Sequence, residues 1–93
     1  PEYTWLIGNY PNPFNPHTSI RFWLKEDSSV SLMVYNARGQ KVRTLINESM
    51  RAGIHDVQFN GKDDAGRDLG SGVYFSLLKS GPYHRIRKMI LSK

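Results

Sequence analysis

The chain has 93 residues, no cysteine and a formal net charge of +5, with 39% hydrophobic and 12% aromatic residues. This length suits one small domain with a single core and is short for a two-domain enzyme with a buried cleft. The lack of cysteine excludes disulfides and cysteine-ligated metal sites, and the charge excess is too mild to indicate nucleic-acid binding. No apolar run approaches the roughly 20 residues that a membrane-spanning helix needs.

The chain is predicted to consist of two regions. Residues 1–8 are predicted to be a linker or an edge segment from a preceding domain, and residues 9–93 are predicted to be one β-sandwich domain. Asn9–Pro16 contains three prolines. Proline fixes φ and pushes the residue before it to extended geometry, so we expect a stiff, extended or turned lead-in. Tyr10 and Phe14 are expected to anchor this lead-in onto the domain.

Alternating apolar residues predict short strands separated by glycine, asparagine, proline and serine turns. The clearest is Thr18–Leu24, with Thr18, Ile20, Phe22 and Leu24 on one face. The other predicted strands are Val30–Tyr35, Lys41–Ile46, Gly53–Phe59, Val73–Leu78 and Tyr83–Ser92. Those beginning at Val30 and Val73 are apolar on both faces, which predicts central positions.

The segment Asn47–Ala52 is interpreted as a loop or a single helical turn. Strands at spacings of about 8–12 residues predict an all-β fold, an immunoglobulin-like antiparallel β-sandwich of about seven strands.

A polar, glycine-rich stretch, Gly61–Phe75, leads into the most apolar strand and carries three carboxylates, Asp63, Asp64 and Asp68. Closely spaced carboxylates are the ligands that calcium prefers, but their spacing does not match the Asp-x-Asp-x-Asp-Gly pattern. We therefore expect a turn stabilised by Asx-type hydrogen bonds, with calcium binding as the weaker interpretation. No cofactor is expected.

The remaining polar residues give no catalytic pattern. The sequence has no Gly-x-Ser-x-Gly motif and no glycine-rich phosphate loop, so no enzyme activity is predicted. His55 alternates with apolar residues and is expected to be a core-edge histidine with one hydrogen-bonded nitrogen. The basic cluster His84–Lys88 lies on a predicted strand, which is typical of a solvated edge strand that resists edge-to-edge pairing.

A series of motifs in order along the chain resembles a known family. The motifs are Asn9–Pro16, Val34–Asn36 with Gly39–Gln40, Ala52–Val57, Gly61–Gly66, Ser71–Tyr74 and Lys88–Lys93. Together they resemble the type A C-terminal sorting domains of the bacterial type IX secretion system, over nearly the whole chain after about residue 6. The chain resembles the immunoglobulin-like domain of flagellar hook-capping proteins more loosely.

The resemblance implies a non-catalytic export signal at the C-terminal end of a larger cargo protein, often a hydrolase. Its implied partners are the outer-membrane secretion machinery and a sortase-like protease, with passage through the periplasm before secretion or attachment to the cell surface. Gly72 and Tyr74 match the Gly-x-Tyr motif of the family. Lys88, Leu91 and Lys93 fall in its lysine-rich terminal motif.

Two other interpretations remain open from the residues alone. Trp5, Trp23 and Tyr83 could stack on sugar rings, as in a carbohydrate-binding module appended to a polysaccharide-degrading enzyme. Alternatively, Trp23 packs between strands or against the proline segment. A passive spacer domain is the third interpretation, and it differs from a sorting signal in not needing Lys93 to be the natural chain end.

Overall fold

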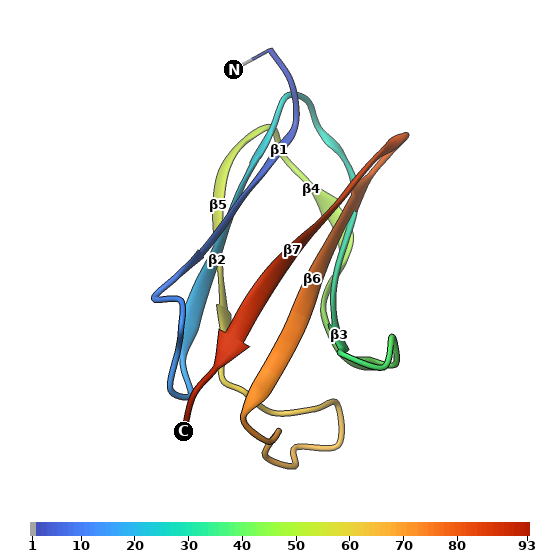
Figure 1. Ribbon diagram of the computed structural model, residues 1–93. Helices are drawn as coiled ribbons and strands as arrows, with labels where there is room; N and C mark the ends of the chain where they lie inside the picture. Colours follow the sequence, from blue (N-terminus) through green and yellow to red (C-terminus); the bar gives the residue numbers. More distant parts are fainter. Residues whose placement is uncertain (1) are drawn as a thin grey trace.

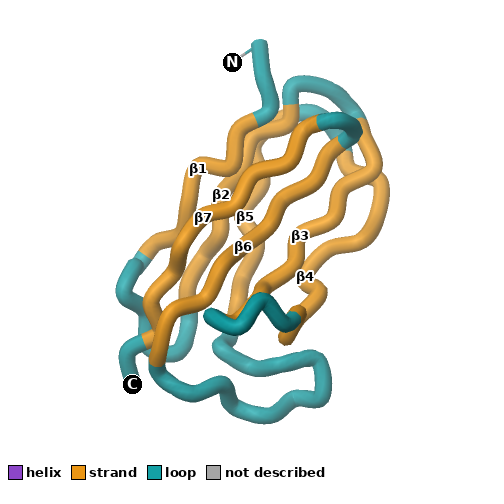
Figure 2. The backbone as a smooth tube through the Cα atoms, turned by 45° about the vertical axis from the view of Figure 1, so that its right-hand side comes forward, coloured by secondary structure: helices purple, strands orange, loops and turns teal. Residues whose placement is uncertain are grey.

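The computed structural model describes residues 2–93, which form seven strands and no helix. The strands are β1 (Trp5–Tyr10), β2 (Thr18–Leu24), β3 (Ser28–Asn36), β4 (Lys41–Met50), β5 (Gly53–Phe59), β6 (Gly72–Ser80) and β7 (Tyr83–Leu91). A three-stranded sheet has the order β1-β2-β5, and a four-stranded sheet has the order β4-β3-β6-β7, with all neighbours antiparallel. The two sheets face each other (Figures 1 and 2), which confirms the predicted sandwich. Within residues 2–93, no helix could span a membrane.

The core lies between the sheets and is built from the alternating residues of each strand. In β2, Thr18, Ile20, Phe22 and Leu24 are all at most 2% exposed, as their alternation predicts. The largest fully buried side chains come from both sheets and from the proline segment: Phe14, Phe22, Phe59, Leu6, Ile20, Leu24, Leu32, Leu78, Met89 and Leu91. Burying each such side chain stabilises the fold by about 1.5–3 kcal/mol, so this layer is the main source of stability.

Strands β3 and β6 occupy the centre of the four-stranded sheet, as predicted. They pair with each other so that Tyr35 lies opposite Phe75 and Met33 lies opposite Leu77. Each also has a second partner, β4 for β3 and β7 for β6. A strand paired on both sides satisfies its backbone groups within the sheet.

The prediction for Asn47–Ala52 was wrong over most of its length, since β4 continues to Met50. Its polar end still pairs with β3, with Asn47 opposite Ser31 and Met50 opposite Ser28. Two register shifts earlier in the hairpin, next to Leu32 and Val34, break the alternation of β4. Backbone pairing holds this strand end in place although its side chains face solvent.

The proline segment packs through one of its two predicted anchors. Phe14 is 1% exposed, and its ring centroid lies 5.9 Å from that of Phe59. Tyr10 is 84% exposed, so its prediction as an anchor was wrong. The reason is register: Tyr10 pairs with Ser19, which alternates with the buried residues of β2 and therefore faces outward.

The N-terminal segment is partly inside the fold. Residues 5–8 belong to β1, an edge strand that pairs with β2 across a register shift between Leu6 and Gly8. Pro1, which was included in the predicted segment 1–8, lies outside the described residues. The boundary between this segment and a preceding domain therefore stays a prediction.

Candidate functional site

The residues of the predicted sorting motif meet at one end of the sandwich, where β6 begins and β7 ends. Gly72 lies opposite Leu91, and the neighbouring pairs are Tyr74 with Met89 and Phe75 with Lys88. Lys93 follows immediately and donates its backbone N–H to Ser71 Oγ at 3.0 Å. Figure 1 shows this end at the bottom, where the chain terminates. The structure thus brings together all the residues of this predicted group.

Gly72 and Tyr74 shape the entry into β6. Gly72 has a φ of 153°, in a region that side-chain-bearing residues rarely adopt. The Tyr74 hydroxyl donates a 2.7 Å hydrogen bond to the carbonyl oxygen of Gly70, four residues earlier. Burial raises the pKa of Tyr74, which keeps this hydroxyl protonated as a donor. Both residues therefore act on the geometry of the preceding loop.

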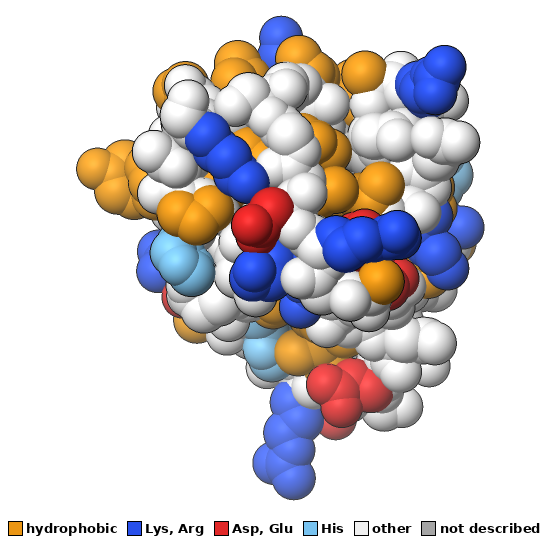
Figure 3. Space-filling model, turned by 90° about the horizontal axis from the view of Figure 1, so that it is seen from below, with side chains coloured by type: hydrophobic (Ala, Val, Ile, Leu, Met, Phe, Trp, Pro, Cys, Tyr) orange, Lys and Arg blue, Asp and Glu red, His pale blue; other side chains and the backbone are white. Residues whose placement is uncertain are grey.

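The other motif residues differ in their exposure. Leu91 is 1% exposed and belongs to the core, whereas Lys88 and Lys93 are exposed. The hydrogen bond from Lys62, aided by the charges of Lys62 and Lys93, lowers the pKa of Asp68. Basic and acidic side chains lie beside one another at this end of the molecule (Figure 3). Lys88 and Lys93 are the two motif side chains able to make charged contacts with a partner.

The proline segment, residues 9–16, forms hydrogen bonds with the outer edge of β7 beside these residues. Asn12 Oδ1 accepts a hydrogen bond from Ile90 N at 2.9 Å, and its Nδ2 donates to Lys88 O at 3.4 Å. Phe14 then forms a parallel bridge, with Phe14 N donating to Ile90 O and Ser92 N donating to Phe14 O, both at 2.9 Å. The sequence analysis missed Asn12. The amide side chain between two prolines was the available signal, because such a rigid segment can hold it in place.

The three carboxylates of the polar loop point to separate partners. Asp63 Oδ1 accepts the N–H groups of Ala65 and Arg67 at 2.9 Å each, an Asx-type turn, and the Lys62 ammonium donates to Asp68 at 2.8 Å. The backbone hydrogen bond from Arg67 is the main cause of the lowered pKa of Asp63. Across residues 2–93, no group of three His, Asp or Glu side chains is placed to hold a metal ion. Asp63 thus stabilises a turn, and Asp68 forms an ion pair with Lys62.

Asp64 reaches across to the edge of β4. Its Oδ1 accepts the N–H of Thr44 at 3.0 Å, and its own N–H donates to Val42 O at 2.9 Å. Arg43 adds a 2.9 Å hydrogen bond to the carbonyl oxygen of Lys62. The polar loop is consequently fixed to β4, much as the proline segment is fixed to β7.

The aromatic residues of the alternative sugar site lie toward the opposite end. Trp5 and Trp23 are directly opposite each other in the β1–β2 pair, and Trp5 is 43% exposed. The ring of Tyr3 lies 6.4 Å from that of Trp5. Tyr83 is instead packed against the core, and its hydroxyl accepts a 2.9 Å hydrogen bond from Leu6 N. The structure brings the two tryptophans together, whereas the Tyr83 hydroxyl links β7 to β1.

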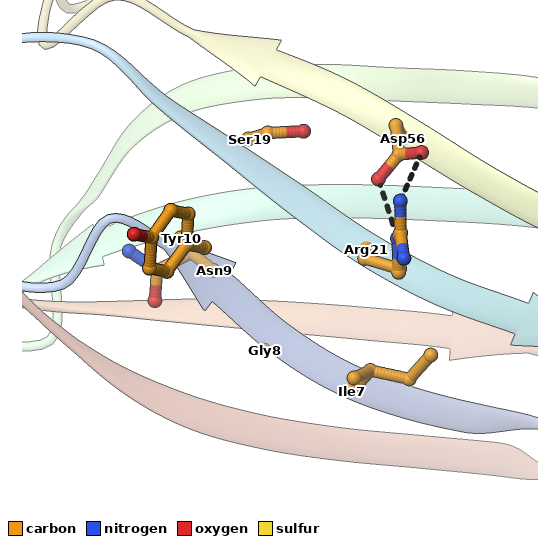
Figure 4. A pocket seen from close by; sticks show the side chains of 7 residues that line it. All are labelled: Ile7, Gly8, Asn9, Tyr10, Ser19, Arg21 and Asp56. Carbon is orange, nitrogen blue, oxygen red and sulfur yellow. Dashed lines mark hydrogen bonds and ion pairs between the residues drawn. The ribbon is translucent and has the colours of Figure 1, made fainter.

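A shallow pocket of about 410 Å³ opens on the outer face of the three-stranded sheet (Figure 4). Its polar floor is the ion pair of Arg21 with Asp56, joined by hydrogen bonds of 2.8 and 3.1 Å. The hydrogen bond from Arg21 lowers the pKa of Asp56. Tyr10 forms part of the rim. The two charged groups of the pocket thus pair with each other.

His55 lies at the edge of the core, as predicted. Its Nε2 lies 2.7 Å from the carbonyl oxygen of Arg51, and its ring stacks on Phe22 with centroids 5.3 Å apart. The imidazole thus bridges the core and a turn.

Two solved structures from Porphyromonas gingivalis resemble the chain over most of its length. Dimeric latent PorU shares 18% sequence identity at a TM-score of 0.74, over 98% of this chain and 9% of that chain. PorZ, an essential bacterial surface component of the type IX secretion system, shares 20% identity at a TM-score of 0.61, over 91% of this chain and 11% of PorZ. This chain therefore spans about a tenth of the length of each protein, and the likeness is one of fold. No curated protein matches the chain significantly in sequence.

A known domain family also matches the chain directly in sequence. Residues 14–79 match the FlgD Ig-like domain, a segment that runs from Phe14 through β2, β3, β4 and β5 into β6. It includes strands of both sheets and ends before β7, so it contains neither Lys88 nor Lys93 of the predicted sorting motif. Because the match covers more than half of the residues, the chain belongs to the FlgD Ig-like domain family.

Proposed function

We propose that this domain is a non-catalytic sorting signal that directs a larger cargo protein through the bacterial outer membrane by type IX secretion. The observation that carries the proposal is the convergence of Gly72, Tyr74, Lys88, Leu91 and Lys93 on one end of the β6–β7 pair. The fold likeness to PorZ, a surface component of that secretion system, supports it.

These five residues fall into two groups by their roles in the structure. Gly72, Tyr74 and Leu91 serve the fold, through backbone geometry, a buried hydroxyl and core packing. Lys88 and Lys93 remain exposed, and contacts from Asn12 and Phe14 hold the end of β7 that lies between them. A rigid strand end with two cations is a surface that a receptor can read by charge and position. In this proposal the receptor belongs to the outer-membrane machinery, and a sortase-like protease then releases the cargo or attaches it to the cell surface.

A secretion assay tests the proposal. A periplasmic reporter carrying residues 1–93 at its C-terminus is expressed in a bacterium with a type IX system. We expect the reporter in the medium or on the cell surface, and the double variant Lys88→Ala/Lys93→Ala should reduce export. Lys25→Ala, in the turn at the opposite end, is the matched control and should export normally. Retention of a folded wild-type reporter in the periplasm would overturn the proposal.

One observation favours a second candidate, a carbohydrate-binding module. Trp5 and Trp23 lie side by side on the outer face of the three-stranded sheet, where flat aromatic rings could stack on a sugar. Affinity electrophoresis against soluble polysaccharides tests this candidate. Retardation that Trp5→Ala abolishes would support it, and unretarded migration on every polysaccharide would remove it.

A further inference from the structure

The outer face of the four-stranded sheet carries an apolar surface on which no other strand of residues 2–93 packs. We call it the apolar face and define it by the outward-facing apolar side chains of β3, β6 and β7. These are Met33, Tyr35, Val73, Phe75, Leu77, Ile86 and Ile90. Register places them in adjoining rows, since Leu77 lies opposite both Met33 and Ile86. The face is therefore continuous across three neighbouring strands.

This face is open to solvent and hollowed at one side. Ile86 is 57% exposed, and Val73 and Ile90 are 37% and 36% exposed. A cavity of about 360 Å³ lies among Phe75, Leu77 and Ile86, walled by the tip of the β3–β4 hairpin at residues 36–39. Exposed apolar patches of this kind mark interaction sites more often than single exposed residues do.

The charged side chains that the strands of this sheet place around the apolar face are all positive. Lys88 lies opposite Phe75, Lys41 lies opposite Tyr35, and Lys79 pairs with Ser31 on the same side. The only acidic residue in β3, β4, β6 and β7, which the structure describes in full, is Glu48. It lies opposite the buried Val30, on the other side of the sheet.

The other sheet shows a different arrangement of charge. On its outer face Arg21 is neutralised by Asp56 in a paired contact. The lysines around the apolar face have no such partner on their own strands, because those strands contain no outward-facing carboxylate. The uncompensated positive charge is thus specific to the four-stranded sheet.

We propose that the apolar face docks a partner protein surface on which carboxylates surround protruding apolar side chains. Positive potential at the rim matches negative potential on such a partner, and the cavity accepts an inserted apolar side chain. A second copy of this chain fits less well, because two such faces would bring their lysines together. A lipid surface also fits less well, since the hollow calls for a side chain that projects into it.

The proposal rests on the geometry of the face and stands apart from the export role. If the domain is a sorting signal, the partner would belong to the secretion machinery, since Lys88 lies both at the apolar face and in the sorting motif. The binding test below needs no secretion host. Failure of export and failure of docking are therefore separate results.

The test uses isotope-labelled chain and defined probes, followed by NMR. A short peptide of alternating glutamate and leucine should shift the amide signals of Phe75, Leu77 and Ile86 in a saturable way, less so at high salt. A peptide of alternating lysine and leucine, with the same apolar content, should bind more than about tenfold more weakly, because like charges would meet at the rim. Vesicles of phosphatidylglycerol form the third arm.

A charge-reversed variant supplies the control. Lys79→Glu/Lys88→Glu should invert the preference between the peptides, while Arg51→Glu, in the turn between β4 and β5, should leave it unchanged. Equal binding of both peptides, shifts confined to other strands, stronger binding to the vesicles or a concentration-dependent dimer through this face would each overturn the proposal. If the double variant fails to fold, the comparison of peptides on the wild-type chain still decides.

Discussion

Gly61 occupies a position where both backbone conformation and space call for glycine. Its φ is 72°, and an added Cβ would lie 3.0 Å from Pro16 O and 3.1 Å from Pro16 Cβ. Gly66 has a similar φ of 82° but no atom within 4 Å of such a Cβ. We expect Gly61→Ala to lower the free energy of unfolding by more than Gly66→Ala, which carries only the conformational cost of about 1 kcal/mol. Urea unfolding of both variants measures the difference, and equal losses would show that the contact with Pro16 relaxes freely.

The acidic residues of the polar loop lead to a second prediction at this scale. Asp63 and Asp68 are engaged by Arg67 and Lys62, and Asp64 holds the N–H of Thr44. Because these contacts already engage the carboxylate oxygens, binding of a divalent ion should add little stability to the loop. The thermal midpoint should therefore be the same with calcium and with EDTA. A midpoint that rises with calcium would indicate a site that these contacts do not reveal.

Gly72 and Tyr74 were singled out by their match to the motif of a known family, and the contacts that the structure gives them are local. Gly72 supplies a backbone angle and Tyr74 reaches only four residues back, to Gly70. The partners that lie far along the chain could not be read in the same way. Asn12 contacts β7 across 78 positions, and no spacing rule connects two such segments.

At the scale of elements, short polar segments close the two edges of the four-stranded sheet. Asn12 covers the end of β7, and Asp64 covers the start of β4. Exposed strand edges invite pairing with other chains, so such covers keep the sheet from extending.

These two covers can be removed independently. Asn12→Ala should speed amide hydrogen exchange at Ile90, whose N–H loses its acceptor, and leave Thr44 unchanged. Asp64→Ala should do the reverse, speeding exchange at Thr44 alone. Each variant thus serves as the control for the other. If both variants speed exchange at both sites, the effect is a general loss of stability and the covers do not act locally.

Strands could be predicted from the sequence where apolar and polar side chains alternate. They were harder to predict where backbone hydrogen bonds alone determine the pairing. β2 alternates cleanly, and the prediction matched both its ends. The end of β4 is polar, so its pairing with β3 had no side-chain signal. In β7 apolar residues occur on both sides, and the structure places Met89 in the core and Ile86 on the surface. The register with β6 settles which side is buried, because Met89 lies opposite the buried Tyr74 and Ile86 lies opposite the outward-facing Leu77.

At the scale of the whole molecule, the chain has a net charge of +5, and several of its carboxylates form ion pairs with basic side chains. The pKa values of Asp56, Asp63 and Asp68 lie below the ordinary value of 3.8, through hydrogen bonds from Arg21, the Arg67 backbone and Lys62 respectively. A carboxyl group whose pKa is lower in the folded state stabilises the fold at neutral pH. That contribution is lost as pH falls below about 4 through the folded-state values.

Acid should therefore destabilise the domain, and Asp63 allows the effect to be isolated. In Asp63→Asn the amide oxygen can still accept from Ala65 and Arg67, but the group no longer titrates. Its free energy of unfolding should fall less between neutral pH and about pH 3 than that of the wild type. Arg67→Gln should keep most of the wild-type pH dependence, because the backbone N–H of residue 67 is the main cause of the lowered pKa. Urea unfolding across this pH range gives both slopes, and identical slopes for wild type and Asp63→Asn would mean that the acid sensitivity arises from the other carboxylates and the growing positive charge.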